Sequence, residues 1–152
     1  MNAHEMTFSV PTSPAPDAAV GLRVGIDITQ ISAIEASLAQ FGERFARRLF
    51  SHDEIAYSMQ APALTAQRLA ARFAAKEAAI KAFGWSESGI NWRDIEVRRA
   101  PDGSCTLALH HHAAALVERS GCTRMAVSLS HDGDYATAMV VAIGSPAAPH
   151  PF

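Results

Sequence analysis

The chain has 152 residues, of which 49% are hydrophobic and 18% are charged. This length suits one domain with a buried core, and this composition excludes an intrinsically disordered protein. The net charge of −2 gives no reason to expect a nucleic-acid partner, and no apolar run approaches the roughly 20 residues of a membrane-spanning helix, so no membrane partner is expected.

The two cysteines, Cys105 and Cys122, do not have the spacing of a metal or redox motif. Reduced thiols in a cytoplasmic protein are therefore expected. The N-terminus contains Glu5 and Asp17 and lacks the basic region followed by an apolar stretch that defines a signal peptide.

Proline marks the two ends of the chain. Six of the eight prolines lie before residue 17 or after residue 145. This distribution predicts disordered tails at residues 1–20 and 145–152 around one domain at residues 21–144.

Residues 22–28 alternate as a β-strand, with Val24, Ile26 and Ile28 on one face. The other face carries Gly25 and Asp27. Asp is depleted in strands, and a strand glycine often marks a close approach by another group. Asp27 is either a functional carboxylate or a cap at the start of the next helix.

The next segment, residues 31–50, has apolar residues at helical spacing and is expected to break at Gly42. Its second part contains a cluster formed by Arg44, Phe45, Arg47 and Arg48. Such a cluster is either a solvated face or a docking surface for an acidic partner.

A capping box at residues 51–54 predicts a short helix over residues 53–60. Thr65 is a suitable N-cap for a long central helix that ends at Gly84. On this helix Phe73, Glu77 and Lys81 share a face.

Beside that face, Arg68, Arg72 and Lys76 are expected to form a basic ridge. Taken alone, Glu77 and Lys81 can be an exposed i,i+4 ion pair that contributes only a few tenths of a kcal/mol.

The second half of the chain predicts a hairpin over residues 95–99 and 105–109, a helix over residues 113–120 and a last hairpin over residues 124–130 and 135–143. Residues 139–142 are continuously apolar, as in a strand covered on both faces. Residues 110–112 are three histidines, which are interpreted as a strand-to-helix junction rather than a metal site. The sum is an α+β fold.

Three motifs together resemble the holo-[acyl-carrier-protein] synthases, the small bacterial type of 4′-phosphopantetheinyl transferase. They are GIDI at residues 25–28, RFAAKEAAIKAFG at 72–84 and VSLSHDGDYA at 127–136, and NWRDIEV at 91–97 also fits the pattern. The resemblance covers the whole predicted core. It implies a single α+β domain in which a long central helix packs on an antiparallel sheet.

The resemblance also implies the activity. Such enzymes transfer 4′-phosphopantetheine from coenzyme A to a serine of an apo acyl carrier protein and release adenosine 3′,5′-bisphosphate. It implies that Asp27 and Glu77 hold Mg²⁺, that Lys81 contacts the transferring phosphate, and that Arg72 and His131 contact coenzyme A phosphates. A homotrimer is implied as well.

Elementary chemistry is compatible with these roles. Mg²⁺ is usually held by one or two carboxylates and keeps positions for water and substrate phosphate. Phosphoryl transfer depends on positioning and electrostatics, which a lysine one turn from a carboxylate can supply. The base for the serine is Glu77 or a metal-bound water. Because carrier proteins are acidic, the cluster formed by Arg44, Phe45, Arg47 and Arg48 is the expected docking surface.

The sequence departs from the family pattern at three places. The Gly-Thr-Gly that usually follows the central helix is replaced by Trp85-Ser86-Glu87 after Gly84, a basic residue early in the first helix is Ala33, and histidines replace a glycine-containing junction at 110–112. Two other functions stay open: a coenzyme A and carrier-binding module without catalysis, and a different metal-dependent enzyme such as a nucleotide pyrophosphohydrolase.

Overall fold

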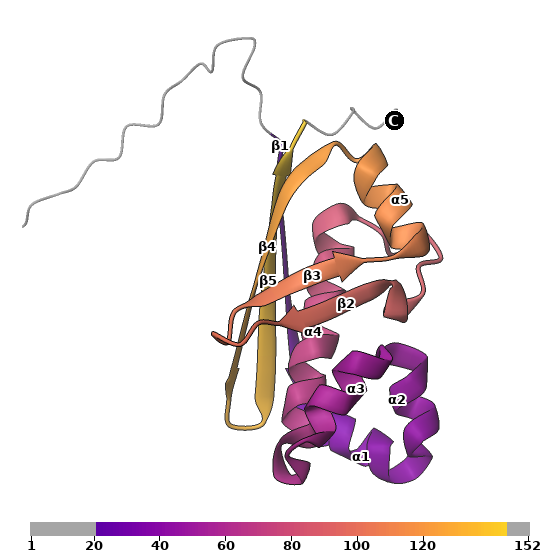
Figure 1. Ribbon diagram of the computed structural model, residues 1–152, viewed down its shortest axis with the longest axis vertical. Coiled ribbons are helices and arrows are strands. Elements are labelled where there is room, and N and C mark those ends of the chain that lie inside the picture. The colour runs from indigo at the N-terminus through magenta and orange to yellow at the C-terminus, as the bar shows by residue number, and fades with distance from the viewer. Residues whose placement is uncertain (1–20, 146–152) are drawn as a thin grey trace, which may run out of the picture.

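The computed structural model describes residues 21–145 as one α+β unit (Figure 1). The elements in chain order are β1 (Gly21–Gln30), α1 (Ile31–Phe41), α2 (Glu43–Leu49), α3 (His52–Met59), η1 (Pro62–Leu64), α4 (Thr65–Phe83), η2 (Trp92–Asp94), β2 (Ile95–Arg99), β3 (Cys105–Leu109), α5 (His111–Arg119), β4 (Cys122–Asp132) and β5 (Tyr135–Gly144). The tails predicted at 1–20 and 145–152 lie outside the described residues, apart from Ser145. None of the helices in residues 21–145 is both long enough and apolar enough to cross a membrane.

The long strands form a three-stranded antiparallel sheet in the order β1-β5-β4, and β2 pairs with β3 in a separate hairpin. Helix α4 packs on β1 and β5. Figure 1 shows the β2–β3 hairpin crossing in front of α4, with α1, α2 and α3 gathered at one end of the molecule and α5 at the other. The predicted arrangement of a long helix on an antiparallel sheet is confirmed.

The contact between β1 and α4 uses the small and polar face of the strand. Gly25 and Thr29 are buried, whereas Val24 and Ile26 are 53% and 54% exposed. In β5, Val140 is fully buried but Met139 is 43% exposed. The prediction of a strand covered on both faces is therefore wrong for the single chain, because α4 covers only one face of the sheet.

Helix α4 presents an alanine face to the sheet. Ala74, Ala75, Ala78 and Ala79 are all fully buried in the main core cluster. The helix ends at Gly84, which has the predicted left-handed conformation (φ 68°, ψ 36°). Small side chains on the helix allow its axis to lie close to the strands.

The helices α1, α2 and α3 enclose a second core cluster around Phe50 and Leu69. The predicted break at Gly42 is confirmed, and so is the capping box formed by Ser51 and Glu54. The predicted N-cap is wrong. Thr65 is the first residue of α4, and its hydroxyl donates hydrogen bonds to the carbonyls of Ser58 and Ala61.

Element boundaries differ slightly from the predicted ones in the second half. Helix α5 begins at His111, and β4 continues to Asp132, so Gly133 and Asp134 alone form the last hairpin turn.

The Asp134 carboxylate accepts hydrogen bonds from the backbone N–H and the hydroxyl of Ser32 at 2.8 and 2.6 Å. This turn therefore caps α1, which lacks a cap of its own.

Candidate active site

A carboxylate and an ammonium meet where β1 crosses α4. The Nζ of Lys81 lies 2.7 Å from Oδ1 of Asp27 and 3.3 Å from the carbonyl of Ile26. The Lys81 side chain is 51% exposed and that of Asp27 is 14% exposed. The hydrogen bond to Asp27 raises the pKa of Lys81, so this group is positively charged at neutral pH.

Thr29 orients the carboxylate. Its hydroxyl donates a 3.0 Å hydrogen bond to Oδ2 of Asp27. Thr29 lies two residues after Asp27 on the same buried face of β1 and is 8% exposed. Thr29 lies just outside the GIDI motif at residues 25–28, and its place on the polar face of the strand, two residues after Asp27, is the signal in the sequence that points to it.

Glu77 lies one turn before Lys81 on α4 and is half-buried. Burial raises the pKa of Glu77, the negative charge of Asp27 raises it further, and the positive charge of Lys81 lowers it. Two carboxylates and one ammonium therefore share one electrostatic environment. The structure brings together the three residues that the sequence placed at the centre of the site.

The donor set suits a magnesium ion. Within residues 21–145 no group of three or more His, Cys, Asp or Glu side chains is arranged to hold a metal. Asp27 and Glu77 supply two hard oxygen donors, and Mg²⁺ completes its coordination with water and phosphate oxygens. Burial is the larger cause of the raised pKa of Glu77, and repulsion from Asp27 adds to it; a bound cation would relieve that repulsion.

The predicted basic ridge on α4 is wrong for two of its three residues. Lys76 is fully buried and Arg72 is 5% exposed. The Lys76 ammonium lies 2.8 Å from Oε2 of Glu54. Burial lowers the pKa of Lys76, and the charge of Glu54 raises it. Helical spacing predicts that these residues share one side of the helix, but it does not predict how deeply their side chains are buried.

Arg72 lies beneath Tyr57. Its guanidinium carbon is 4.3 Å from the centre of the Tyr57 ring, and those of Arg68 and Arg99 are 4.6 and 5.9 Å away. One Nη of Arg72 donates to the carbonyl of Arg68 at 3.1 Å. Among the described residues its buried Nε has no hydrogen-bond partner. Tyr57 and Arg72 line a small cavity of about 260 Å³.

His131 is an exposed residue of β4. The strand register aligns Thr29 with Ala136, and Ala136 with His131. Residues in register across a sheet share a face, so His131 lies on the same face as Thr29 and Asp27, two strands away. It is placed beside the site rather than within it.

The predicted docking cluster lies on α2. Arg44, Arg47 and Arg48 are exposed, whereas Phe45 is half-buried and packs against the second core cluster. Arg47 forms an exposed ion pair with Glu43 at 2.8 Å. The arginines therefore form the outward-facing part of this cluster.

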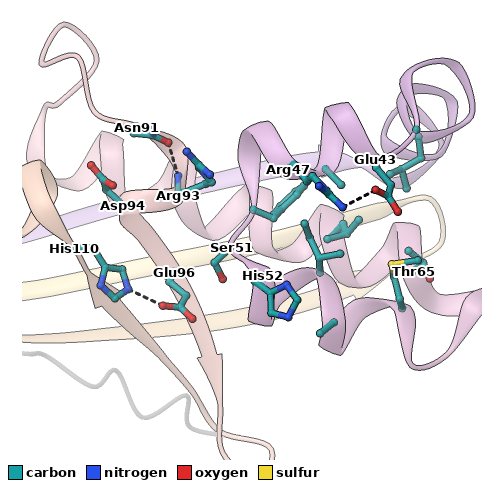
Figure 2. Close-up of a pocket in the computed structure, with 18 of the residues that line it drawn as sticks. Glu43, Arg47, Ser51, His52, Thr65, Asn91, Arg93, Asp94, Glu96 and His110 are labelled. Atoms are coloured by element: carbon teal, nitrogen blue, oxygen red, sulfur yellow. Dashed lines mark hydrogen bonds and ion pairs between the residues drawn. The ribbon is translucent and has the colours of Figure 1, made fainter.

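A cavity of about 1090 Å³ lies elsewhere, between the helices α1, α2 and α3 and the segment around η2 (Figure 2). Its floor includes Phe50 and Leu69. Figure 2 shows His110 and Glu96 paired on one side, with Nε2 and Oε2 2.6 Å apart. The Asp27 region is the stronger candidate for a reaction site, because the two interacting carboxylates Asp27 and Glu77 and the half-exposed Lys81 lie there.

The three histidines form the predicted strand-to-helix junction. His110 faces Glu96, whereas Nε2 of His112 lies 3.0 Å from the carbonyl oxygen of Ser88.

Trp85, which begins the loop after α4, is 6% exposed and stacks on Phe83 with ring centres 4.5 Å apart. The loop is therefore anchored to the end of the helix that carries Lys81.

A model of the 4′-phosphopantetheinyl transferase superfamily matches residues 23–140. The chain is similar to a holo-[acyl-carrier-protein] synthase from Nitratidesulfovibrio vulgaris, with 48% identity over 78% of this chain and 94% of that protein. It is also similar to one from Gloeobacter violaceus, with 43% identity over 80% of this chain and 92% of that protein.

Among solved structures, the ACPS–CoA complex of Chronobacterium ammoniagenes matches with a TM-score of 0.72 and 33% identity, over 80% of this chain and 96% of that one. The fold, the motif positions and these similarities agree. The chain belongs to the 4′-phosphopantetheinyl transferase superfamily.

Proposed function

We propose that this chain is a holo-[acyl-carrier-protein] synthase, which transfers the 4′-phosphopantetheine arm of coenzyme A to a serine of an apo acyl carrier protein. Its curated relatives have this name, and one structural neighbour is a coenzyme A complex. The observation that carries the proposal is the joint placement of Asp27, Lys81 and Glu77 at the crossing of β1 and α4.

In the proposed reaction the serine oxygen attacks the phosphorus on the pantetheine side of the diphosphate. A new P–O bond forms, the bond to the second phosphate breaks, and adenosine 3′,5′-bisphosphate leaves. Lys81 donates to the transferring phosphate, since half of its side chain is exposed. The serine proton goes to Glu77, which lies half-buried one turn before Lys81, or to a water beside it.

Asp27 and Glu77 are the residues that would hold Mg²⁺. Bound there, the ion would offset the charge that develops on the phosphate oxygens. Thr29 keeps the Asp27 carboxylate in one orientation through its 3.0 Å hydrogen bond. Arg72 and His131 are proposed as contacts for the other phosphates of coenzyme A. The unpartnered Nε of Arg72 supports that role for the arginine.

A homotrimer is proposed as the working assembly. The uncovered face of the sheet presents large apolar side chains, namely Leu22, Val24, Ile26, Ile28 and Met139. An exposed row of large apolar side chains on one sheet face is typical of a protein–protein interface. A cytoplasmic location remains a prediction and is compatible with the unpaired thiols of Cys105 and Cys122.

The decisive experiment incubates the protein with coenzyme A, Mg²⁺ and a panel of apo carrier proteins, and measures the mass of each carrier. We expect a gain of one phosphopantetheine group that requires Mg²⁺. Coenzyme A binding without any mass gain would favour a non-catalytic binding module. Release of adenosine bisphosphate without a carrier would favour a pyrophosphohydrolase.

A further inference from the structure

Lys76, the residue before Glu77, is fully buried inside the domain. Its ammonium donates to Oε2 of Glu54 at 2.8 Å and to the carbonyl of Trp92 at 3.1 Å, and it also contacts the carbonyl of Ile95. A lysine has three N–H donors and no acceptor. Three acceptors therefore occupy all three donors, and none remains for a substrate phosphate.

Glu54 is the other half of this pair and is 1% exposed. Its Oε2 also accepts a 2.8 Å hydrogen bond from the backbone N–H of Ser51, and its Oε1 accepts a 2.9 Å bond from that of Val97. The pair thus ties α4 to the start of α3, to η2 and to β2. Both charges are desolvated, and each is compensated by directional hydrogen bonds.

On the opposite side of α4, the half-exposed Lys81 bonds to Asp27 and to the Ile26 carbonyl near the end of the helix, and the rest of that side packs on the sheet through apolar contacts. There the buried residues of the helix are mostly alanines, and the helix backbone at Ala78 and Ala82 lies directly against Gly25 of β1. Hydrophobic burial is non-directional, and methyl groups form only shallow ridges, so this interface resists rotation of the helix about its axis weakly. A carboxylate about 6 Å from the axis moves by about 2 Å when a helix turns by about 20°.

We propose that the buried Lys76–Glu54 pair fixes the rotation of α4 about its axis and thereby holds Glu77 opposite Asp27. Lys76 is then a positioning residue, not a substrate contact. The inference rests on the proposed function for its kinetic readout. A misplacement of 1 Å can cost about 100-fold in rate, so a loosely oriented helix would lower turnover without removing any group that touches substrate.

The test uses three variants, Lys76→Met, Glu54→Gln and the double variant. Each single variant leaves a buried group without its partner, so we expect its Tm to fall by on the order of 10 °C. The double variant removes both charges together, and its Tm should recover to within a few degrees of the wild type. Turnover should not recover. We expect kcat to stay lower by on the order of 100-fold in the double variant.

Coenzyme A binding, measured by calorimetry without a divalent cation, distinguishes a positioning role of Lys76 from a contact with a substrate phosphate. A positioning residue should change the Kd by less than about threefold, whereas loss of a phosphate contact should weaken binding by tenfold or more. Lys76→Gln, whose amide keeps two donors, is a milder variant that should show the same split between kcat and Kd. Ile34→Ala, a core substitution in α1, serves as a control with a lowered Tm and normal kcat.

Recovery of kcat together with Tm in the double variant would show that the pair contributes only to stability. A tenfold weaker Kd for coenzyme A in Lys76→Gln would make Lys76 a substrate contact, and either result overturns the inference. Failure of the proposed function is distinguishable, because then the wild-type protein itself would not modify any carrier.

Discussion

Gly25 of β1 lies directly against the backbone of α4 at Ala78. A Cβ atom at position 25 would lie 1.9 Å from the Ala78 carbonyl oxygen and 2.6 Å from the backbone nitrogen of Ala82. The missing side chain lets the strand and the helix approach closely. Asp27, two residues further on the same face, thereby reaches Lys81 on the next turn of the helix.

Gly25→Ala should therefore damage both the fold and the site. The obstructing atoms belong to the backbone of α4, so the helix has to move away from β1, and we expect a loss of about 1–3 kcal/mol in the free energy of unfolding. Because the same movement separates Asp27 from Lys81, kcat should fall much more than the stability loss explains. Chemical denaturation and the carrier assay measure the two effects.

Gly103→Ala is the matched control. Gly103 lies in the β2–β3 turn with φ 89°, and a Cβ there would meet only the flexible end of Arg99 at 3.1 Å. We expect a stability loss of about 1 kcal/mol from the left-handed backbone and an unchanged kcat. If Gly25→Ala, like this control, leaves kcat unchanged, then the close approach of β1 to α4 does not position Asp27 and Lys81.

Glu77→Gln should stabilise the metal-free protein at neutral pH while it abolishes transfer. Burial and the charge of Asp27 raise the pKa of Glu77 in the folded chain, so the folded state holds this proton more tightly than the unfolded state. Stability of the wild type is then lost as the pH rises from the ordinary glutamate pKa of about 4.3 through the raised value. Glutamine does not titrate, so the variant lacks this loss.

Thermal unfolding at several pH values checks the sign. The Tm of Glu77→Gln should exceed that of the wild type at neutral pH, and the difference should shrink below the ordinary glutamate pKa. Addition of Mg²⁺ should raise the Tm of the wild type but not that of the variant, because binding to the folded state alone is stabilising. An equal Mg²⁺ effect in both proteins would contradict the assignment of Glu77 as a ligand.

Much of the fold can be predicted from the sequence, because the sequence signals for these elements are local. The strand around Asp27, the capping box at Ser51 and Glu54, and the left-handed end of α4 at Gly84 each depend on residues close together in the chain. The family resemblance supplied the site residues, and the structure brings Asp27 and Lys81 into contact. Their catalytic roles remain predictions.

What the sequence did not predict depends on distant partners. Periodicity placed Lys76 in an exposed basic ridge with Arg68 and Arg72, but its hydrogen-bond acceptors come from α3 and from the segment that begins β2. The cap of α1 comes from Asp134, 102 residues after Ser32. Alternation in β1 defines two faces but does not indicate which one packs on α4. The face with the small residues Gly25 and Thr29 is buried there, whereas the face with the larger apolar residue Val24 is exposed.

Val24→Lys tests whether the exposed sheet face is the subunit interface. Val24 is 53% exposed in the single chain and aligns with Val141 near the middle of the sheet. A lysine there is tolerated in an isolated chain but would be desolvated in an assembly, which is costly without a partner. We expect light scattering to change from a trimer to a monomer while the circular dichroism spectrum is kept.

Met59→Lys is the control for this change, since Met59 is 57% exposed at the end of α3. It should leave the oligomeric state as in the wild type. A trimer that persists in Val24→Lys, or a wild type that is itself a monomer, would contradict the proposed assembly.

The last prediction concerns the acidic carrier. Arg44 and Arg48 are exposed on α2 and, unlike Arg47, have no ion-pair partner within residues 21–145. Replacing both with glutamate reverses the local charge, so association with an acidic partner should become slower and less dependent on salt. We expect KM for the carrier to rise by on the order of tenfold, with KM for coenzyme A and kcat nearly unchanged.

Arg119→Glu is the control for net charge, which it changes by −2, half of the −4 of the double reversal. Arg119 is exposed on α5, at the opposite end of the molecule from α2 (Figure 1). Its effect on KM for the carrier should be small, because charges separated by more than about 10 Å are largely screened at moderate salt. If Arg119→Glu raises KM for the carrier in proportion to its charge change, with about half the effect of the double reversal on the logarithm of KM, then net charge, rather than a docking surface on α2, governs the encounter with the carrier.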